Sequence, residues 1–152
     1  MTEAAAELGA DQRTVRVLVC DDDPVMGAAV TDLVRDTDGL VLVGLATDAD
    51  SAVTLAEALA PDVVLLDVRM PGGGGPRAAR MIRRRLPNAR MVAFSAHSDR
   101  HGVLAMLQSG VREYLVKGID GDTAIVDALR RTSGGRLGLS HAETEARFAE
   151  NH

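Results

Sequence analysis

The sequence predicts a single doubly wound α/β domain whose five parallel strands form one sheet covered by helices on both faces. Strand-like apolar runs alternate five times with segments in which apolar residues recur at helical spacing. This alternation is typical of right-handed crossover connections between parallel strands. The strand runs are nearly continuous in apolar residues, as expected for parallel strands buried on both faces. A length of 152 residues fits one such domain and allows it a substantial core.

Local patterns place these elements in alternation along the chain. Strands are expected at residues 15–20, 40–46, 61–67, 91–95 and 113–116. Helices are expected at residues 24–37, 48–60, 76–86, 99–108 and 122–132. Polar tails are expected at 1–14 and 133–152, on either side of a domain at 15–132.

The first two strand–helix units have clear start and stop signals. The first strand, VRVLVC, leads directly into Asp21-Asp22-Asp23-Pro24. Proline suits the first turn of a helix, and an aspartate just before it can cap the exposed amide groups. Asp38-Gly39 then breaks the helical pattern, LVLVGLA follows as the second strand, and Pro61 ends the second helix.

The remaining units begin with an apolar run that stops at a carboxylate. This third strand ends at Asp67, and a Pro-Gly turn follows at Pro71. The four glycines 72–75 predict an unusually loose hinge before the third helix. The fourth strand, MVAFS, ends at Ser95, and the fifth, EYLV, ends just before Lys117. The last helix then carries apolar residues at helical spacing.

Composition argues against several classes of protein. A formal net charge of −5 disfavours general binding to nucleic-acid phosphates. Cys20 is the one cysteine, so no internal disulfide can form, and a reducing cytoplasm is the simplest setting. The acidic N-terminus lacks the cationic and apolar regions of a signal peptide, and no apolar run approaches the length of a membrane span.

Chemically distinctive side chains stand where four of the expected strands end. They are Asp21, Asp22 and Asp23 after the first strand, Asp67 after the third, Ser95 at the end of the fourth and Lys117 after the fifth. In open α/β sheets, ligands bind outside the carboxyl ends of the strands. These side chains are therefore expected to converge on one edge of the sheet.

Such a cluster suits a divalent metal and a phosphoryl group. Neighbouring carboxylates repel one another unless a cation lies among them, and Mg²⁺ prefers oxygen ligands from one or two carboxylates, water and phosphate. A carboxylate there could attack a phosphoryl group as a nucleophile, and the metal and Lys117 would offset the charge that develops. Singly, Asp23 is most simply a helix cap, Asp67 a turn former and Lys117 a solvated charge. Their combination favours a site for a divalent metal and a phosphoryl group.

The motifs VLVCDDDP, VVLLDVRMPGGGG, VAFSA and YLVKG occur in an order and spacing that resemble the receiver domain of bacterial two-component response regulators. The resemblance covers roughly residues 15–132. It implies a CheY-like, flavodoxin-like (βα)5 fold with strand order 2-1-3-4-5. Lys117 is followed by Gly118, which is more like receivers of the NarL/FixJ type than those with proline at this position.

The resemblance also implies roles for individual residues. Asp67 would accept a phosphoryl group from a sensor histidine kinase or phosphotransfer protein. Asp21 and Asp22 would hold Mg²⁺ together with Asp67 and the backbone carbonyl of Arg69. Lys117 would be the charge partner of the phosphoryl group.

Further positions match the switch and the entrance of such a site. Ser95 matches the switch hydroxyl, and Tyr114 matches the switch aromatic that swings inward on activation. Ala96 matches the small residue that leaves the phosphoryl group accessible. Arg69 and His97 would rim the entrance.

The same resemblance extends to activity, partners and location. The protein would catalyse only its own phosphorylation and dephosphorylation, in the cytoplasm and away from membranes. It would signal through the surface of the fourth helix, fifth strand and fifth helix. A homodimer could use that surface or the first and fifth helices. The first helix, near Met26 and Ala29, would contact the kinase.

Other interpretations remain open. The chain could be the receiver half of a NarL/FixJ-type DNA-binding regulator whose helix-turn-helix domain lies beyond His152, although the chain itself should not bind DNA. Gly73, Gly75 and Ala78 fit the G-x-G-x-x-A pattern of a nucleotide-binding doubly wound domain, but the pattern follows the third strand and lacks a ribose-binding acid. A phosphatase with an aspartyl nucleophile would want an acid where Arg69 stands.

One basic feature belongs to none of these interpretations. Arginines crowd the expected third helix, at positions 80, 83, 84 and 85. A solvated helix face is the simpler explanation, and a surface that docks a partner is the alternative.

Overall fold

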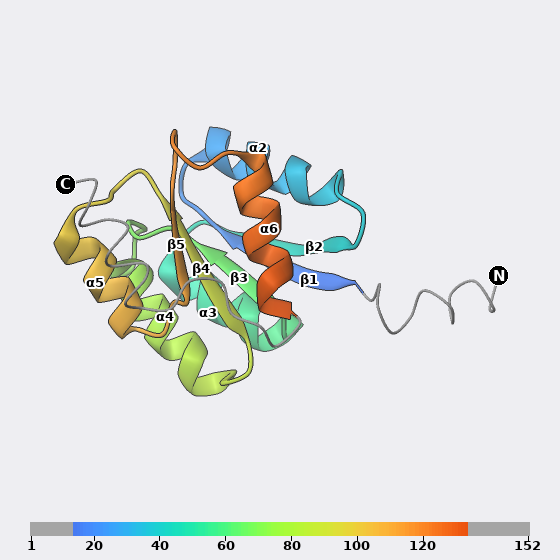
Figure 1. The fold of residues 1–152 in the computed structure, drawn as a ribbon. Helices are drawn as coiled ribbons and strands as arrows, with labels where there is room; N and C mark the ends of the chain where they lie inside the picture. The colour runs from blue at the N-terminus through green and yellow to red at the C-terminus, as the bar shows by residue number, and fades with distance from the viewer. Residues whose placement is uncertain (1–13, 134–152) are drawn as a thin grey trace.

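The computed structural model describes residues 14–133, which form one five-stranded parallel sheet with helices on both faces (Figure 1). The strands are β1 (Val15–Cys20), β2 (Leu40–Ala46), β3 (Val63–Leu66), β4 (Arg90–Ser95) and β5 (Glu113–Val116). The helices are α2 (Pro24–Arg35), α3 (Ala49–Leu59), α4 (Gly74–Arg85), α5 (Arg100–Gln108) and α6 (Asp122–Ser133). The strand order is β2-β1-β3-β4-β5, which confirms the doubly wound fold predicted from sequence.

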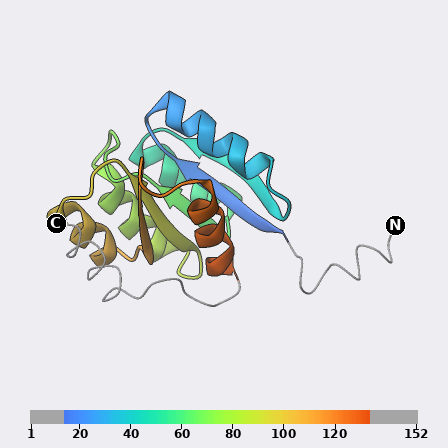
Figure 2. The ribbon, with the colours of Figure 1, turned by 45° about the horizontal axis from the view of Figure 1, so that its top comes forward.

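Two apolar layers enclose the sheet. Helices α2 and α6 pack on one face through residues such as Val30, Val34 and Leu129. Helices α3, α4 and α5 pack on the other face through residues such as Val53 and Ile82. Figures 1 and 2 show the sheet between these two groups of helices. Every residue of β3, the central strand, is buried, which explains why its sequence is apolar without alternation.

Side-chain caps fix the starts of three helices. Asp23 precedes α2 and accepts hydrogen bonds from the backbone amides of Val25 and Met26, so it is the cap that the sequence predicts. Asp48 and Asp99 cap α3 and α5 from just outside each helix. Both helices therefore begin one residue later than the sequence predicts. Helix α4 begins at Gly74 rather than at Pro76, because two of the four glycines join its first turn.

The expected tails fall almost entirely outside the described residues. Among residues 14–133, no helix combines the length and the apolar character that crossing a bilayer requires.

Candidate functional site

The carboxyl edge of the sheet brings together the acids and the lysine that the sequence singles out. Backbone hydrogen bonds extend the sheet one residue past three strands and hold these residues in place. The amide of Asp21 donates to the Ala46 carbonyl at 2.9 Å, and the amide of Asp67 donates to the Cys20 carbonyl at 2.9 Å. The amide of Lys117 donates to Ser95 in the same way at 2.9 Å. The site is therefore fixed to the main-chain frame of the sheet.

Lys117 bridges two nearly buried carboxylates. Its Nζ lies 2.7 Å from Oδ2 of Asp21 and 3.1 Å from Oδ2 of Asp67. The Lys117 side chain is only 10% exposed, and its Nζ also lies 5.8 Å from the centre of the Phe94 ring. The sequence predicts the contact with Asp67, whereas the shorter contact with Asp21 emerges only from the structure.

Burial and charge act against each other in this cluster. Burial raises the pKa of the Asp21 carboxyl, and the hydrogen bond from Lys117 opposes that shift. Burial alone would lower the pKa of Lys117, but the hydrogen bonds and negative charges of Asp21 and Asp67 outweigh it and raise that pKa. The ammonium is thus the main charge that compensates these acids within the described residues.

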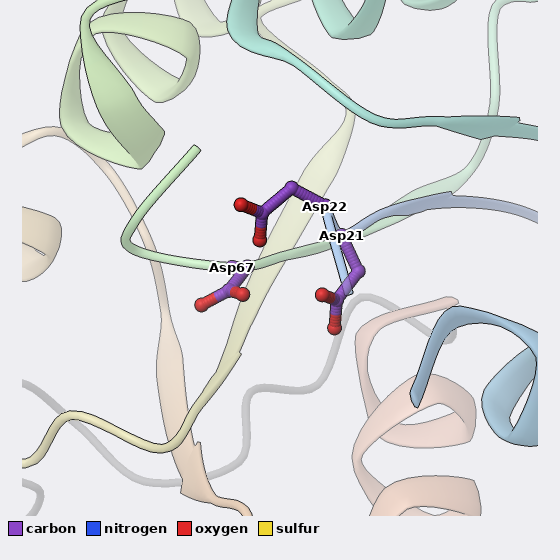
Figure 3. Close-up of side chains that lie close together, drawn as sticks. All are labelled: Asp21, Asp22 and Asp67. Atoms are coloured by element: carbon purple, nitrogen blue, oxygen red, sulfur yellow. The ribbon is translucent and has the colours of Figure 1, made fainter. Parts of the chain in front are cut away.

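Three carboxylates have the arrangement that a metal ion needs. Asp21, Asp22 and Asp67 each offer an oxygen, and these oxygens all lie within 4.8 Å of one another (Figure 3). Oδ1 of Asp67 is buried and has no hydrogen-bond partner among the described residues. A buried carboxylate oxygen without a partner is costly, and carboxylate oxygens are the donors that Mg²⁺ prefers. The donor set therefore fits Mg²⁺, and Asp22, which is exposed, leaves the site open to solvent.

A further contact orients Asp21. The backbone amide of Asp23 donates a hydrogen bond to Oδ1 of Asp21 at 2.9 Å. Asp23 thus has two roles, because its side chain caps α2 while its amide holds the buried acid. Sequence reasoning identifies only the cap.

A buried polar chain runs from the site toward β5. Ser95 is fully buried, and its Oγ accepts a hydrogen bond from the His97 amide at 3.2 Å. The hydroxyl of Tyr114 donates to the His97 carbonyl. Tyr114 is fully buried, and burial raises its pKa to about 12. The aromatic that the family resemblance expects to swing inward therefore lies inside in this structure.

The remaining predicted residues lie around the opening. The side chains of Arg69 and Ala96 are exposed, and His97 is half-buried. The positive charge of Arg69 helps to lower the pKa of Asp99, after the larger effect of the hydrogen bond from the Gly102 amide. Arg69 therefore lies close to the start of α5. The role of its backbone carbonyl as a metal ligand stays a prediction.

The glycine run has a steric function. Gly72, Gly73 and Gly74 all have positive φ angles, of 87°, 103° and 81°, which residues with a side chain rarely adopt. A Cβ on Gly75 would lie 2.9 Å from Val68 Cα and closer still to the carbonyl oxygen of Asp67. The glycines therefore allow α4 to start directly against the backbone of Asp67. The loose hinge expected from the sequence is, in the structure, a tightly packed turn.

This turn also argues against the dinucleotide-binding interpretation. In such a motif the glycines let a phosphate approach the backbone. Here the space beside Gly75 is filled by the main chain of residues 67 and 68.

Comparison with known proteins agrees with the geometry. Residues 17–130 match the family model described as the response regulator receiver domain. Response regulator GacA of Pseudomonas viridiflava is 36% identical over 126 residues, which cover 83% of this chain and 58% of that protein. The chain thus spans somewhat under three fifths of the length of this curated relative.

Solved structures show the same fold. The signal receiver domain of the putative response regulator NarL from Mycobacterium tuberculosis has a TM-score of 0.76 and 37% identity, covering 82% of this chain and 99% of that one. The receiver domain of the sensor histidine kinase PA1611 from Pseudomonas aeruginosa PAO1 has a TM-score of 0.72 and 27% identity, covering 80% of this chain and 98% of that one. That structure is described with a magnesium ion coordinated in the active site cleft.

Proposed function

Because the chain belongs to the family of response regulator receiver domains, we propose that Asp67 is its phosphoacceptor. A carboxylate oxygen of Asp67 attacks the phosphorus of a phosphohistidine on a histidine kinase or phosphotransfer protein. A P–O bond forms, the P–N bond breaks, and its electron pair stays on the imidazole nitrogen. The product is an aspartyl phosphate.

One observation carries this assignment. Asp67 is 6% exposed, and its two oxygens differ, because Oδ2 is held by Lys117 while Oδ1 has no partner within the described residues. A carboxylate with one oxygen held by an ammonium keeps its orientation, and the other oxygen, which has no hydrogen-bond partner among the described residues, remains available to form a new bond. Within the described part of the chain, no other acid at the carboxyl edge of the sheet has a buried oxygen without a hydrogen-bond partner.

Other residues of the site would support the transfer. Asp21, Asp22 and Asp67, with the Arg69 carbonyl, would hold Mg²⁺, whose charge lowers the cost of bringing a phosphoryl group to the acids. Lys117 is placed to neutralise a phosphoryl oxygen, since its Nζ already contacts Asp67. The hydroxyl of Ser95 would donate a hydrogen bond to the acyl phosphate.

The same contacts suggest how the modification spreads. Ser95 and Tyr114 both hydrogen-bond to His97, so a pull on Ser95 shifts the segment that Tyr114 holds. That segment connects β4 to α5, and Tyr114 lies on β5. The surface of α5, β5 and α6 is therefore the proposed output face, with two arrangements biased by the phosphoryl group.

Several finer points are proposals on the same basis. The receiver domain spans 15–132, lies in the cytoplasm, and turns over no substrate beyond its own phosphorylation and dephosphorylation. Its partners are a sensor histidine kinase or phosphotransfer protein and, through α5-β5-α6 or α2-α6, a second copy of itself. Ala96 and His97 control access to the aspartyl phosphate.

A second proposal concerns the output. The 37% identity to the signal receiver domain of a putative response regulator NarL agrees with the NarL/FixJ-type features of the sequence, and we propose that the chain is the receiver half of a DNA-binding regulator of that type. The reading frame beyond His152 tests this idea, and a stop codon directly after that residue would contradict it.

The assignment of Asp67 as the phosphoacceptor can be tested by measuring the mass of the intact chain after phosphorylation. We expect acetyl phosphate with Mg²⁺ to add one phosphoryl group to the wild-type chain and none to Asp67→Asn, as read by intact-mass spectrometry. Asp32→Asn, which changes an exposed acid on α2, serves as the matched control and should be labelled like the wild type. Equal labelling of Asp67→Asn and wild type would remove Asp67 from the role.

A further inference from the structure

A second hollow lies at the opposite end of the sheet from the acids. It has a volume of about 430 Å³ and is lined by Arg83, Pro87, Asn88, Ala89, Arg90, Met91, Gly110 and Arg112. Arg90 is the first residue of β4, whereas Ser95, at the acidic site, is its last. Arg112 directly precedes β5, whereas Lys117 directly follows it. The two sites thus lie at opposite ends of the same two strands.

Three arginines from separate elements line this hollow. Arg83 comes from α4, Arg90 from β4 and Arg112 from the loop before β5, and no acidic residue is among the lining residues that the structure describes. Burial, and then the positive charge of Arg112, lower the pKa of Arg90. The two guanidiniums therefore repel each other while both stay charged at neutral pH.

Two arginines of α4 form ion pairs, whereas Arg83 and Arg112 at the hollow form none with the described residues. Arg77 pairs with Asp50 at 2.9 Å, and Arg85 pairs with Glu57 at 2.6 Å. Within residues 14–133, neither Arg83 nor Arg112 has a carboxylate at ion-pair distance. Of the four arginines that crowd this helix in the sequence, Arg85 is paired and Arg83 lines the hollow.

A glycine shapes one wall. Gly110 has a φ of 107°, and a Cβ there would lie 2.7 Å from Cδ of Arg83. Any larger residue would push the Arg83 side chain out of its position. The missing side chain at Gly110 thus leaves room for the Arg83 side chain against this turn.

We propose that this hollow binds a small, multiply charged oxyanion, carrying at least two phosphate or carboxylate groups. Guanidinium groups present paired donors that match the oxygens of both kinds of group. Arg83 and Arg112 have no carboxylate at ion-pair distance among the described residues, and no acid lines the hollow, so an anion with two charges can offset both guanidinium groups. The volume lies within the range of small-molecule sites, roughly 300–1,000 Å³. The acidic chain as a whole repels anions, so binding depends on this local cluster.

The test is calorimetric titration of the full chain with pyrophosphate and, separately, with citrate, in metal-free buffer. Omitting Mg²⁺ keeps the acidic site from recruiting the probe. We expect one equivalent of probe to bind, with preference for pyrophosphate if phosphate is the natural group and for citrate if carboxylate is. Arg112→Gln and Arg83→Gln should each weaken binding roughly tenfold, as loss of a charge-assisted hydrogen bond does.

Arg84→Gln is the matched control. It removes the same charge from an exposed neighbour on α4 that does not line the hollow, and its affinity should stay within about twofold of the wild type. Amide shifts in the NMR spectrum of the wild type should centre on Gly110 and Ala89. Labelling of Asp67 by acetyl phosphate should be unchanged in Arg112→Gln, so this inference and the proposed function fail separately.

Three results would overturn the proposal. They are the absence of binding by the wild type at millimolar probe, equal weakening by Arg84→Gln, and amide shifts centred on Asp21 and Asp67.

Discussion

Replacing Gly75 by alanine separates two explanations of the glycine run. If these glycines act through flexibility, Gly75→Ala removes freedom from the unfolded chain and stabilises the protein by about 0.4–1 kcal/mol. If they act through close packing, the new methyl group collides with the backbone of residues 67 and 68. The two explanations therefore predict opposite signs for the change in stability.

The structure favours destabilisation by about 2 kcal/mol. A Cβ on Gly75 would meet Val68 Cα at 2.9 Å, and the obstacle is main chain that cannot rotate away as a side chain would. Overpacking of this kind typically costs about 1–3 kcal/mol, and the upper part of that range applies to a backbone obstacle. Subtracting the gain of about 0.4–1 kcal/mol from the unfolded chain leaves roughly 2 kcal/mol.

Urea unfolding followed by circular dichroism measures this change, with Gly27→Ala as the control. Gly27 lies within α2, and a Cβ there would make only ordinary contacts, the nearest at 3.6 Å. The control should be more stable than wild type by about 0.5–1 kcal/mol. Gly75→Ala should also slow labelling of Asp67, since the collision moves its carbonyl group. A Gly75→Ala protein as stable as the control and labelled at the wild-type rate would refute the packing argument.

Three further predictions follow from the site and the core. Asp22→Ala should weaken Mg²⁺ binding at least several-fold by calorimetry, because one of the three proposed carboxylate ligands is lost. An Asp32→Ala control should bind normally, and unchanged binding by Asp22→Ala would exclude Asp22 as a ligand. Tyr114, the one tyrosine, should ionise in the folded protein with a midpoint near 12 in ultraviolet absorbance rather than at its ordinary pKa of 10.0. Because its folded pKa is raised, stability is complete below pH 10.0 and falls as pH rises toward 12, and a midpoint near 10 in the folded protein would contradict its burial. Arg131→Met should lower the free energy of unfolding by roughly 2–3 kcal/mol, because it leaves Glu113 buried without its partner. The double variant Glu113→Leu with Arg131→Met should recover most of that loss. If the effects of the two substitutions on stability simply add, the two residues are not coupled.

The sequence predicts the fold well because its local signals agree with the packing. Strands β1, β2 and β5 have the same bounds in the structure as in the sequence-based prediction. Their ends coincide with polar or turn-forming residues. The residues of β1 and β5 are almost all buried, whereas the edge strand β2 is apolar although Val41 and Leu45 are exposed. Helix α4 was placed two residues too late. Its start depends on the approach of Gly75 to the Asp67 carbonyl, a contact between segments that no local pattern reports.

The candidate site was predictable for a related reason. In a parallel sheet the strand ends meet at one edge, so Asp21, Asp67 and Lys117 could be placed together once the strands were identified. The preference of Lys117 for Asp21 could not be predicted, since it depends on side-chain reach across strands that are not neighbours in the sheet. The arginine-lined hollow lies at the opposite end of the strands, where the sequence offers no comparable cluster of complementary side chains. Its members Arg90 and Arg112 stand where β4 and β5 begin.

The acidic site keeps its chemistry at a cost in stability. Burial raises the pKa of Asp21, so the stability contributed by this group is present below its ordinary pKa of 3.8 and is lost as pH rises through the raised value. Lys117 offsets part of that cost through its contacts with Asp21 and Asp67, but Oδ1 of Asp67 stays without a partner among the described residues. Any cation that binds only the folded site restores stability by mass action. Under the proposed function, the Asp67 oxygen that would react with the phosphoryl group is therefore the same buried oxygen that has no partner among the described residues of the metal-free site.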